Sequence, residues 1–255
     1  MFERCFSGDL VSCPPSAPRR ALGDWARKLV LAHFGASPAD LSAEEFRQAL
    51  SGAREAVGEE PEGRSLAISC LAEAGIELDH DLFLDTLRLR AVSPGLERNP
   101  AAAPAFYAHR DTWYGNPRGQ LNGWMPLVEV DERNSFRFYL DAFETPVEND
   151  SHLFDGLAFL ERGGFGRTAS DPVSPYPRAL QPPAGRVHDV VLAPDSLLFF
   201  SAAHLHQTLP NQTATPRFSL DFRFFRLSDL QADRGAPDPD NRSRGGALQS
   251  YLPCR

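Results

Sequence analysis

Apolar residues recur at helical spacing in the first third of the chain. Residues 19–34 place apolar side chains three and four positions apart, which is typical of a helix with one buried face. A second helical pattern begins at Ser42, which forms a capping box with Glu45. Residues 60–76 open beside a proline and repeat the helical period. The pattern therefore predicts three helices that form a helical support over 19–80.

From residue 82 onward the period changes from helical to alternating, which is typical of half-buried strands. The clearest case is 217–225, RFSLDFRFF, in which Phe or Leu alternates with Arg, Ser, Asp and Arg. The predicted strands are 84–92, 120–130, 134–143, 186–193, 196–206 and 217–225. Many short strands after a helical part predict a mainly β fold. We expect a double-stranded β-helix (jelly roll, cupin-like) core over 82–226, with the N-terminal helices packed on one side.

Three stretches follow neither period. Residues 1–18 are rich in Pro and Ser and are expected to form an irregular arm. Residues 145–185 carry many Gly and Pro in their second half, and a loop of that length is a lid, a binding loop or a disordered segment. The polar tail 228–255 is expected to be poorly ordered. At 255 residues, the chain is predicted to form a single domain over 1–255.

Composition and charge narrow the classes of partner. The chain is 42% hydrophobic and 24% charged, which is typical of a soluble protein with a sizeable core. Its net charge of −8 argues against a nucleic-acid binder, which would need a basic stripe. The same charge gives no reason to expect an anionic membrane surface, and no apolar run is long enough to span a membrane. The charge says nothing sharper about the substrate.

The cysteines and the first residues bear on the compartment. The four cysteines form no CxxC pair and have no zinc-site spacing. The first twenty residues carry early charges and no apolar core, unlike a secretory signal. We therefore expect reduced thiols in a cytoplasmic protein.

The triplet His109-Arg110-Asp111 is the first candidate for chemistry. On an extended strand, residues i and i+2 point to the same side, so an imidazole and a carboxylate would meet. With a second His they form the two-His-one-carboxylate face of non-heme iron sites. Such a triplet also recurs by chance in loops, and the second His is either His204 or His206, which share a strand face.

A second candidate lies on the last strand, where Arg217 and Ser219 share the polar face. A guanidinium and a hydroxyl inside a barrel could hold a carboxylate, because the planar fork of Arg matches both carboxylate oxygens. The alternative is an ordinary strand whose polar face lies in water.

Taken in order, HRDTWYG, QLNGWMPL, FSAAHLHQTLPN and RFSLDFR resemble the iron(II)/2-oxoglutarate-dependent dioxygenases. The resemblance is to the phytanoyl-CoA dioxygenase-like branch, including small bacterial oxygenases of amino acids and natural-product precursors, and it covers about 82–226. In that branch the distal ligand His is followed by a Pro-Asn pair and then by Arg-x-Ser. His206 matches that frame, and His204 does not.

The resemblance implies a ligand set and a reaction class. Fe(II) would be held by His109, Asp111 and His206, with 2-oxoglutarate and O2 filling the remaining positions. The far carboxylate of 2-oxoglutarate would pair with Arg217 and Ser219. The enzyme would abstract a hydrogen from an unactivated C–H bond, giving hydroxylation, desaturation or ring closure, with succinate and CO2 as co-products. Related halogenases lack the carboxylate that Asp111 supplies, so halogenation is not expected.

The sequence offers further candidate site residues around the triplet and Arg217. Gln120 or Asn122 could donate to the near carboxylate of 2-oxoglutarate, although a polar strand face beside a turn explains them equally well. Aromatic residues around the site are candidate pocket walls or core filler. The candidates for a substrate pocket are Trp113, Tyr114, Trp124 and Arg88. Relatives often carry two adjacent tryptophans where this chain has Gly123-Trp124, which is expected to leave a space near the site.

Three classes of function are therefore weighed. The leading one is an oxygenase acting on an amino acid or a metabolite derived from one. The second is a non-catalytic cupin-type binding protein that retained polar residues in its interior. The third is a metalloenzyme that does not use 2-oxoglutarate, which would want a His in place of Asp111 and would not need Arg217.

Overall fold

The computed structural model describes residues 1–161, 176–246 and 248–255. The described helices are α1 (Phe2–Phe6), α2 (Ala17–Phe34), α3 (Ala43–Glu59), α4 (Pro61–Glu73), α5 (Gly156–Glu161) and α6 (Leu227–Gln231). The described strands are β1 (Val11–Cys13), β2 (Leu82–Leu84), β3 (Arg88–Val92), β4 (Leu121–Pro126), β5 (Phe136–Tyr139), β6 (Val187–Asp189), β7 (Leu197–Ser201), β8 (His206–Thr208), β9 (Arg217–Arg226) and β10 (Leu252–Pro253). Among these residues, no helix has the length and apolar character needed to cross a membrane.

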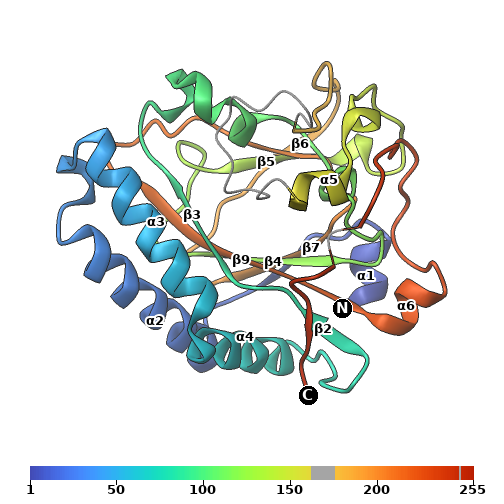
Figure 1. Cartoon of the computed structure of the whole chain (residues 1–255), viewed down its shortest axis with the longest axis horizontal. Helices are drawn as coiled ribbons and strands as arrows, with labels where there is room; N and C mark the ends of the chain where they lie inside the picture. Colours follow the sequence, from blue (N-terminus) through green and yellow to red (C-terminus); the bar gives the residue numbers. More distant parts are fainter. Residues whose placement is uncertain (162–175, 247) are drawn as a thin grey trace.

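The three predicted N-terminal helices are confirmed as α2, α3 and α4. The hydroxyl of Ser16 accepts a hydrogen bond from the Arg19 backbone at the start of α2, which ends at Phe34 and is followed by Gly35 with a positive φ of 69°. At the start of α3 the capping box is present in both directions between Ser42 and Glu45. The three helices lie together over one face of the β structure (Figure 1).

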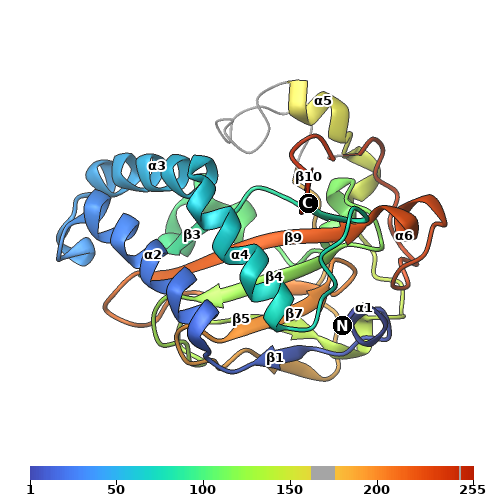
Figure 2. The same ribbon diagram turned by 90° about the horizontal axis from the view of Figure 1, so that it is seen from below.

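Two antiparallel sheets form the β structure, and they confirm the predicted jelly-roll fold. The major sheet has seven strands in the order β1-β7-β4-β9-β2-β10, and β3 also pairs with β9. The minor sheet has the order β6-β5-β8. Strand β9 is long enough to pair with β3 through its first half and with β2 at its end. Figure 1 shows α2 and α4 below β9 and β4 and strand β5 above them, and in Figure 2 α2 and α4 lie in front of the strands.

The two faces of the major sheet bury different side chains. The outer face packs against α2, α3 and α4 and includes Phe218, Leu220, Phe222 and Phe224 of β9. The inner face turns toward the minor sheet, where Trp124 and Phe200 pack against Phe136 and Phe138. Because side chains alternate along a strand, the polar residues of β9 lie on the inner face. These residues are Arg217, Ser219, Asp221 and Arg223.

Two terminal predictions were wrong. The expected irregular arm contains α1 and β1, with Phe2 and Cys5 buried in the main core and β1 paired with β7. The expected poorly ordered tail follows a defined path, because Ala236 and Tyr251 are buried and β10 pairs with β2. Of the expected loop at 145–185, residues 162–175 lie outside the described residues, and α5 lies within the remainder.

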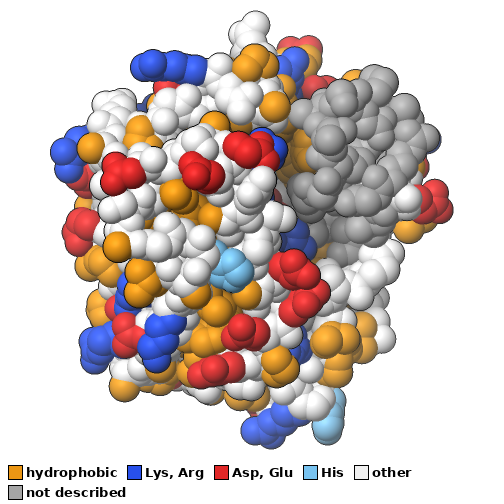
Figure 3. Space-filling view, turned by 60° about the vertical axis from the view of Figure 1, so that its left-hand side comes forward, with side chains coloured by type: hydrophobic (Ala, Val, Ile, Leu, Met, Phe, Trp, Pro, Cys, Tyr) orange, Lys and Arg blue, Asp and Glu red, His pale blue; other side chains and the backbone are white. Residues whose placement is uncertain are grey.

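In the view of Figure 3, acidic and basic side chains are interspersed over the described surface.

Candidate metal and cosubstrate site

Three potential metal ligands converge between the two sheets. The nearest ligand atoms of His109, Asp111 and His206 all lie within 4.8 Å of one another. The Nε2 atom of His109 is 3.5 Å from Oδ1 of Asp111. Two imidazoles and one carboxylate on one side of a metal form the donor set that leaves neighbouring positions open.

Backbone pairing positions these residues. His109 and His206 form an isolated antiparallel bridge, and each backbone N–H donates to the other's carbonyl at 2.9 Å. Asp111 begins a short 3-10 helix, η4 (Asp111–Tyr114), and its N–H donates to the carbonyl of Ala202. The expectation of a continuous strand through the triplet was therefore wrong beyond Arg110. The helical turn at Asp111 still leaves its carboxylate facing both histidines.

Each cluster histidine has its Nδ1 held by a backbone carbonyl. Nδ1 of His109 is 2.8 Å from the Tyr107 oxygen, and Nδ1 of His206 is 3.0 Å from the His204 oxygen. A carbonyl accepts only, so Nδ1 carries the hydrogen in a neutral ring and Nε2 keeps its lone pair for the cluster. Burial, with the charge of His109, lowers the pKa of His206 to about 4, so its ring is neutral at pH 7.

A chain of hydrogen bonds orients Asp111 from the far end of the sequence. Asn122 Nδ2 donates to Asp111 Oδ2 at 2.7 Å, and Gln120 Nε2 donates to Asn122 Oδ1 at 2.9 Å. The hydroxyl of Tyr251 donates to Gln120 Oε1 at 2.6 Å. Gln120 and Asn122, predicted as partners of the cosubstrate, thus act on the candidate metal ligand in this structure. Sequence reasoning missed Tyr251, whose only signal is an aromatic residue in a polar tail.

Asp111 is ionised despite its burial. Burial alone would raise the pKa of Asp111, but the Arg223 guanidinium and the histidines lower it well below its usual range. Arg223 Nε lies 4.0 Å from Asp111 Oδ2. The Asp111 carboxylate therefore presents an anionic oxygen to the cluster of His109, Asp111 and His206 at any physiological pH.

Arg217 and Ser219 lie on the inner face with unsatisfied polar atoms. Arg217 donates from Nη1 to the Asn134 carbonyl, while its Nε is fully covered without a partner among the described residues. The hydroxyl of Ser219 is likewise covered and unpaired within that described part of the chain. Burial lowers the pKa of Arg217 to about 10, which leaves it charged at neutral pH. Buried groups of this kind call for an acceptor beyond the described residues, and an anionic acceptor would suit the Arg217 guanidinium.

His204 belongs to the core. It is 3% exposed, its Nε2 lies 3.1 Å from the Gly8 carbonyl, and its ring packs 4.4 Å from the centroid of Phe143. Burial lowers its pKa to about 4. His204 is absent from the cluster that the structure brings together around His206.

The predicted pocket residues fall into different settings. Trp113 is fully buried, packs with Tyr139 and Leu205 and donates to Asp240 at 2.9 Å, which favours core filler over a pocket wall. The ring of Tyr114 lies 5.3 Å from that of His109. Trp124 faces Arg217, whose guanidinium carbon lies 5.7 Å from the ring centroid. Arg88 pairs with Asp85 at 2.8 Å.

Gly123 leaves no space at the site. Its side-chain position points to the outer face, where an added Cβ would come within 2.5 Å of the Phe222 ring. The space expected from the missing tryptophan is therefore already filled by Phe222. The residue that faces the inner side at this point is Trp124.

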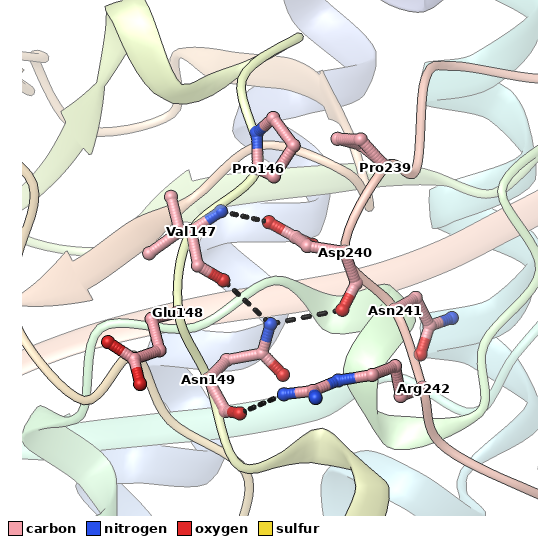
Figure 4. Close-up of a pocket in the computed structure, with 8 residues that line it drawn as sticks. All are labelled: Pro146, Val147, Glu148, Asn149, Pro239, Asp240, Asn241 and Arg242. Atoms are coloured by element: carbon pink, nitrogen blue, oxygen red, sulfur yellow. Dashed lines mark hydrogen bonds between the residues drawn. The ribbon is translucent and has the colours of Figure 1, made fainter.

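The C-terminal segment supports the triplet through Asp240. This carboxylate accepts from Arg110 Nε and Nη2, from Trp113 and from the Val147 backbone at 2.8–3.2 Å. Figure 4 shows a pocket between 146–149 and 239–242, in which the Asn149 amide bridges the carbonyls of Val147 and Asp240. Arg110, fully buried between the two candidate ligands, is thereby paired with a residue that lies 130 positions away.

The similarity of this chain to known proteins lies in its fold. No protein-family model and no curated protein matches the chain. The chain is similar to EvdO2 from Micromonospora carbonacea var. aurantiaca, with TM-score 0.53, 15% identity, and 89% of this chain and 91% of that chain covered. A structure of EvdO2 complexed with 2-oxoglutarate matches with TM-score 0.52 and the same identity and coverage. The chain is also similar to ThoJ, described as a non-heme monooxygenase, with TM-score 0.50, 17% identity, and 88% and 76% covered. At these identities the likeness establishes the shared fold.

Proposed function

We propose that this chain is an Fe(II)- and 2-oxoglutarate-dependent oxygenase of a small molecule. The observation that carries the proposal is the convergence of His109, Asp111 and His206, with both Nε2 atoms left available by carbonyls at Nδ1. These residues fit iron because the donor set is two imidazoles and one ionised carboxylate.

The inner face of β9 also fits the cosubstrate. The buried Nε of Arg217 and the buried hydroxyl of Ser219 have no partner among the described residues, and a carboxylate would satisfy both. In our proposal these two residues hold the far carboxylate of 2-oxoglutarate. The fold shared with EvdO2, which has been crystallised with 2-oxoglutarate, supports this choice.

When bound, iron with 2-oxoglutarate and dioxygen supplies hydrogen abstraction from an unactivated C–H bond, with succinate and CO2 as co-products. The chain contributes fixed geometry: Asn122 holds one oxygen of Asp111, and the carbonyls of Tyr107 and His204 fix the two rings. Phe136, Phe138 and Phe200 surround His206 with ring centroids at 5.6–6.2 Å and restrict water beside it.

The presence of Asp111 favours hydroxylation, desaturation or ring closure, because its carboxylate occupies the place that a halide would need. The proposed substrate is an amino acid or a metabolite derived from one, and the setting we propose is natural-product biosynthesis. Both assignments rest on the sequence resemblance.

The test is turnover of 2-oxoglutarate. Purified protein with Fe(II), 2-oxoglutarate and air should form succinate, and His206→Ala should lose this activity together with tight iron binding. His188→Ala, which replaces an exposed histidine of the minor sheet, is the matched control and should retain both. Succinate formation that persists in His206→Ala, or iron binding without any use of 2-oxoglutarate, would contradict the proposal and favour one of the alternatives.

A further inference from the structure

Arg223 is a buried cation beside the cluster, and the proposed function uses it only through its effect on the charge of Asp111. Its side chain is 9% exposed, Nε lies 4.0 Å from Asp111 Oδ2, and Nη1 lies 3.9 Å from Asp85 Oδ2. Neither distance is a hydrogen bond, and no described residue accepts one from this guanidinium. Because Arg carries five N–H donors, burial without acceptors is costly unless a bound anion supplies them.

Strand register places Arg223 on the inner face, among other cations. It pairs across β9 and β4 with Asn122, which itself contacts Asp111. Arg88 and Arg90 of β3 lie on the same face, opposite Asp221 and Ser219. Arg90 is 42% exposed in its side chain, so this group of cations extends from the cluster toward solvent.

The carboxylates beside Arg223 are engaged more closely by other arginines. Asp85 is shared between Arg88 at 2.8 Å and Arg223 at 3.9 Å, and Arg90 uses Asp221 at 2.9 Å. The carboxylate of Asp111 is committed to the metal in the proposed function. Arg223 is therefore left without a close acceptor among the described residues. Its planar fork matches the two oxygens of a carboxylate, which can accept two parallel hydrogen bonds from it.

We propose that Arg223, with Arg88 and Arg90 behind it, binds a carboxylate of the substrate beside the metal. This inference rests on the proposed function, and it narrows the substrate to a small carboxylic acid held by its acid group. The carboxylate would accept hydrogen bonds from the guanidinium that the described residues leave unused. The reacting carbon would then be a carbon of the same molecule that lies at the metal while the acid group is bound to Arg223 of β9.

The test compares acids with their amides. Protein loaded with Fe(II) and 2-oxoglutarate under anaerobic conditions is titrated by calorimetry with free L-amino acids and simple aliphatic acids, each beside its carboxamide. We expect at least one acid to bind wild type about tenfold or more tightly than its amide, by the strength of a charge-assisted hydrogen bond. Arg223→Gln should remove that preference when it is measured at the same iron and 2-oxoglutarate loading as wild type. Arg226→Gln, at the end of the same strand, is the matched control and should keep the preference.

Three results would overturn the inference. The first is that wild type prefers no acid over its amide. The second is that Arg223→Gln keeps the preference of wild type unchanged. The third is loss of 2-oxoglutarate or iron binding in Arg223→Gln, which would assign the guanidinium to the cosubstrate or to Asp111. Arg223→Lys, which keeps the charge, should retain part of the preference, and circular dichroism of both variants verifies folding. If wild type binds no iron or 2-oxoglutarate, the proposed function fails, and the same titration of the metal-free protein still reads the Arg223 contribution.

Discussion

The two faces of β9 are both buried, yet their side chains are satisfied to very different degrees. On the outer face, Phe218, Leu220, Phe222 and Phe224 pack against helices and other strands in one continuous apolar core. On the inner face, Arg217 and Ser219 have covered polar atoms without a described partner, and Arg223 has only long ion pairs. The same ten residues thus stabilise the fold on one side and leave groups for a ligand on the other.

The two faces of β9 contribute differently to stability and to ligand binding. Apolar packing is complete in the folded chain, so removing it lowers the free energy of unfolding. Buried donors without acceptors oppose folding and are compensated only when an anion arrives. Substitutions on the outer face should therefore change stability, and those on the inner face should change ligand affinity.

The largest effect is expected on the outer face. Phe222→Ala removes a side chain that is 1% exposed, and we expect it to lower the free energy of unfolding by about 3–5 kcal/mol. Urea denaturation measures this loss, with Ser219→Ala on the opposite face as the control that should change stability by less than about 1 kcal/mol. Equal effects from the two substitutions would erase the contrast between the faces.

The inner face should respond in affinity. Arg217→Met should weaken 2-oxoglutarate binding by about 2–5 kcal/mol, because the partner charge is lost from a buried site. Stability should stay level or rise, since a well-packed apolar side chain replaces a buried guanidinium with an unpaired Nε. Calorimetry on wild type, Arg217→Met and the control Arg226→Met separates the two outcomes. Unchanged affinity in Arg217→Met would remove Arg217 from the cosubstrate site.

Gly123→Ala tests whether position 123 faces the outer side of the major sheet, because it adds only a Cβ atom there. Gly123→Ala adds a Cβ toward the Phe222 ring and should cost about 1–3 kcal/mol of stability through overpacking. The affinity for 2-oxoglutarate should not change, because the added methyl lies on the outer face. A double-mutant cycle with Phe222→Leu checks the cause by thermal unfolding, since Gly123→Ala should cost less stability in the Phe222→Leu background than in wild type. A selective loss of cosubstrate affinity would place Gly123 at the site instead.

The smallest effect concerns pH. Burial lowers the pKa of His204 to about 4 from about 6.5 in the unfolded chain. Between these values the unfolded state binds a proton that the folded state does not, so stability is full above pH 6.5 and falls toward pH 4. The slope is up to about 1.4 kcal/mol per pH unit for each such histidine. Metal-free His204→Gln should therefore lose less stability than wild type between pH 7 and 5.5 in urea denaturation. Parallel losses would show that His204 does not titrate in this way.

The elements that could be predicted from the sequence are those with a hydrophobic period or a recognisable motif. Alternation along 217–225 identified both faces of β9, and helical spacing with the Ser42 capping box identified the support. The ordered tail escaped prediction because its anchors are tertiary: Asp240 meets Arg110 and Trp113, and Tyr251 meets Gln120, without any local pattern. The turn at Asp111 was missed because a single 3-10 helix has too few residues to show a period.

The central claim is that the cluster and the inner face of β9 together form one iron and 2-oxoglutarate site. Its most direct test is an anaerobic titration of the protein with Fe(II) and then 2-oxoglutarate, followed by visible absorption. The account predicts a charge-transfer band that is absent in His206→Ala, retained in His188→Ala, and reached only at higher 2-oxoglutarate concentration in Arg217→Met. Bound iron without a band in wild type, or a band that is indifferent to Arg217, would contradict it.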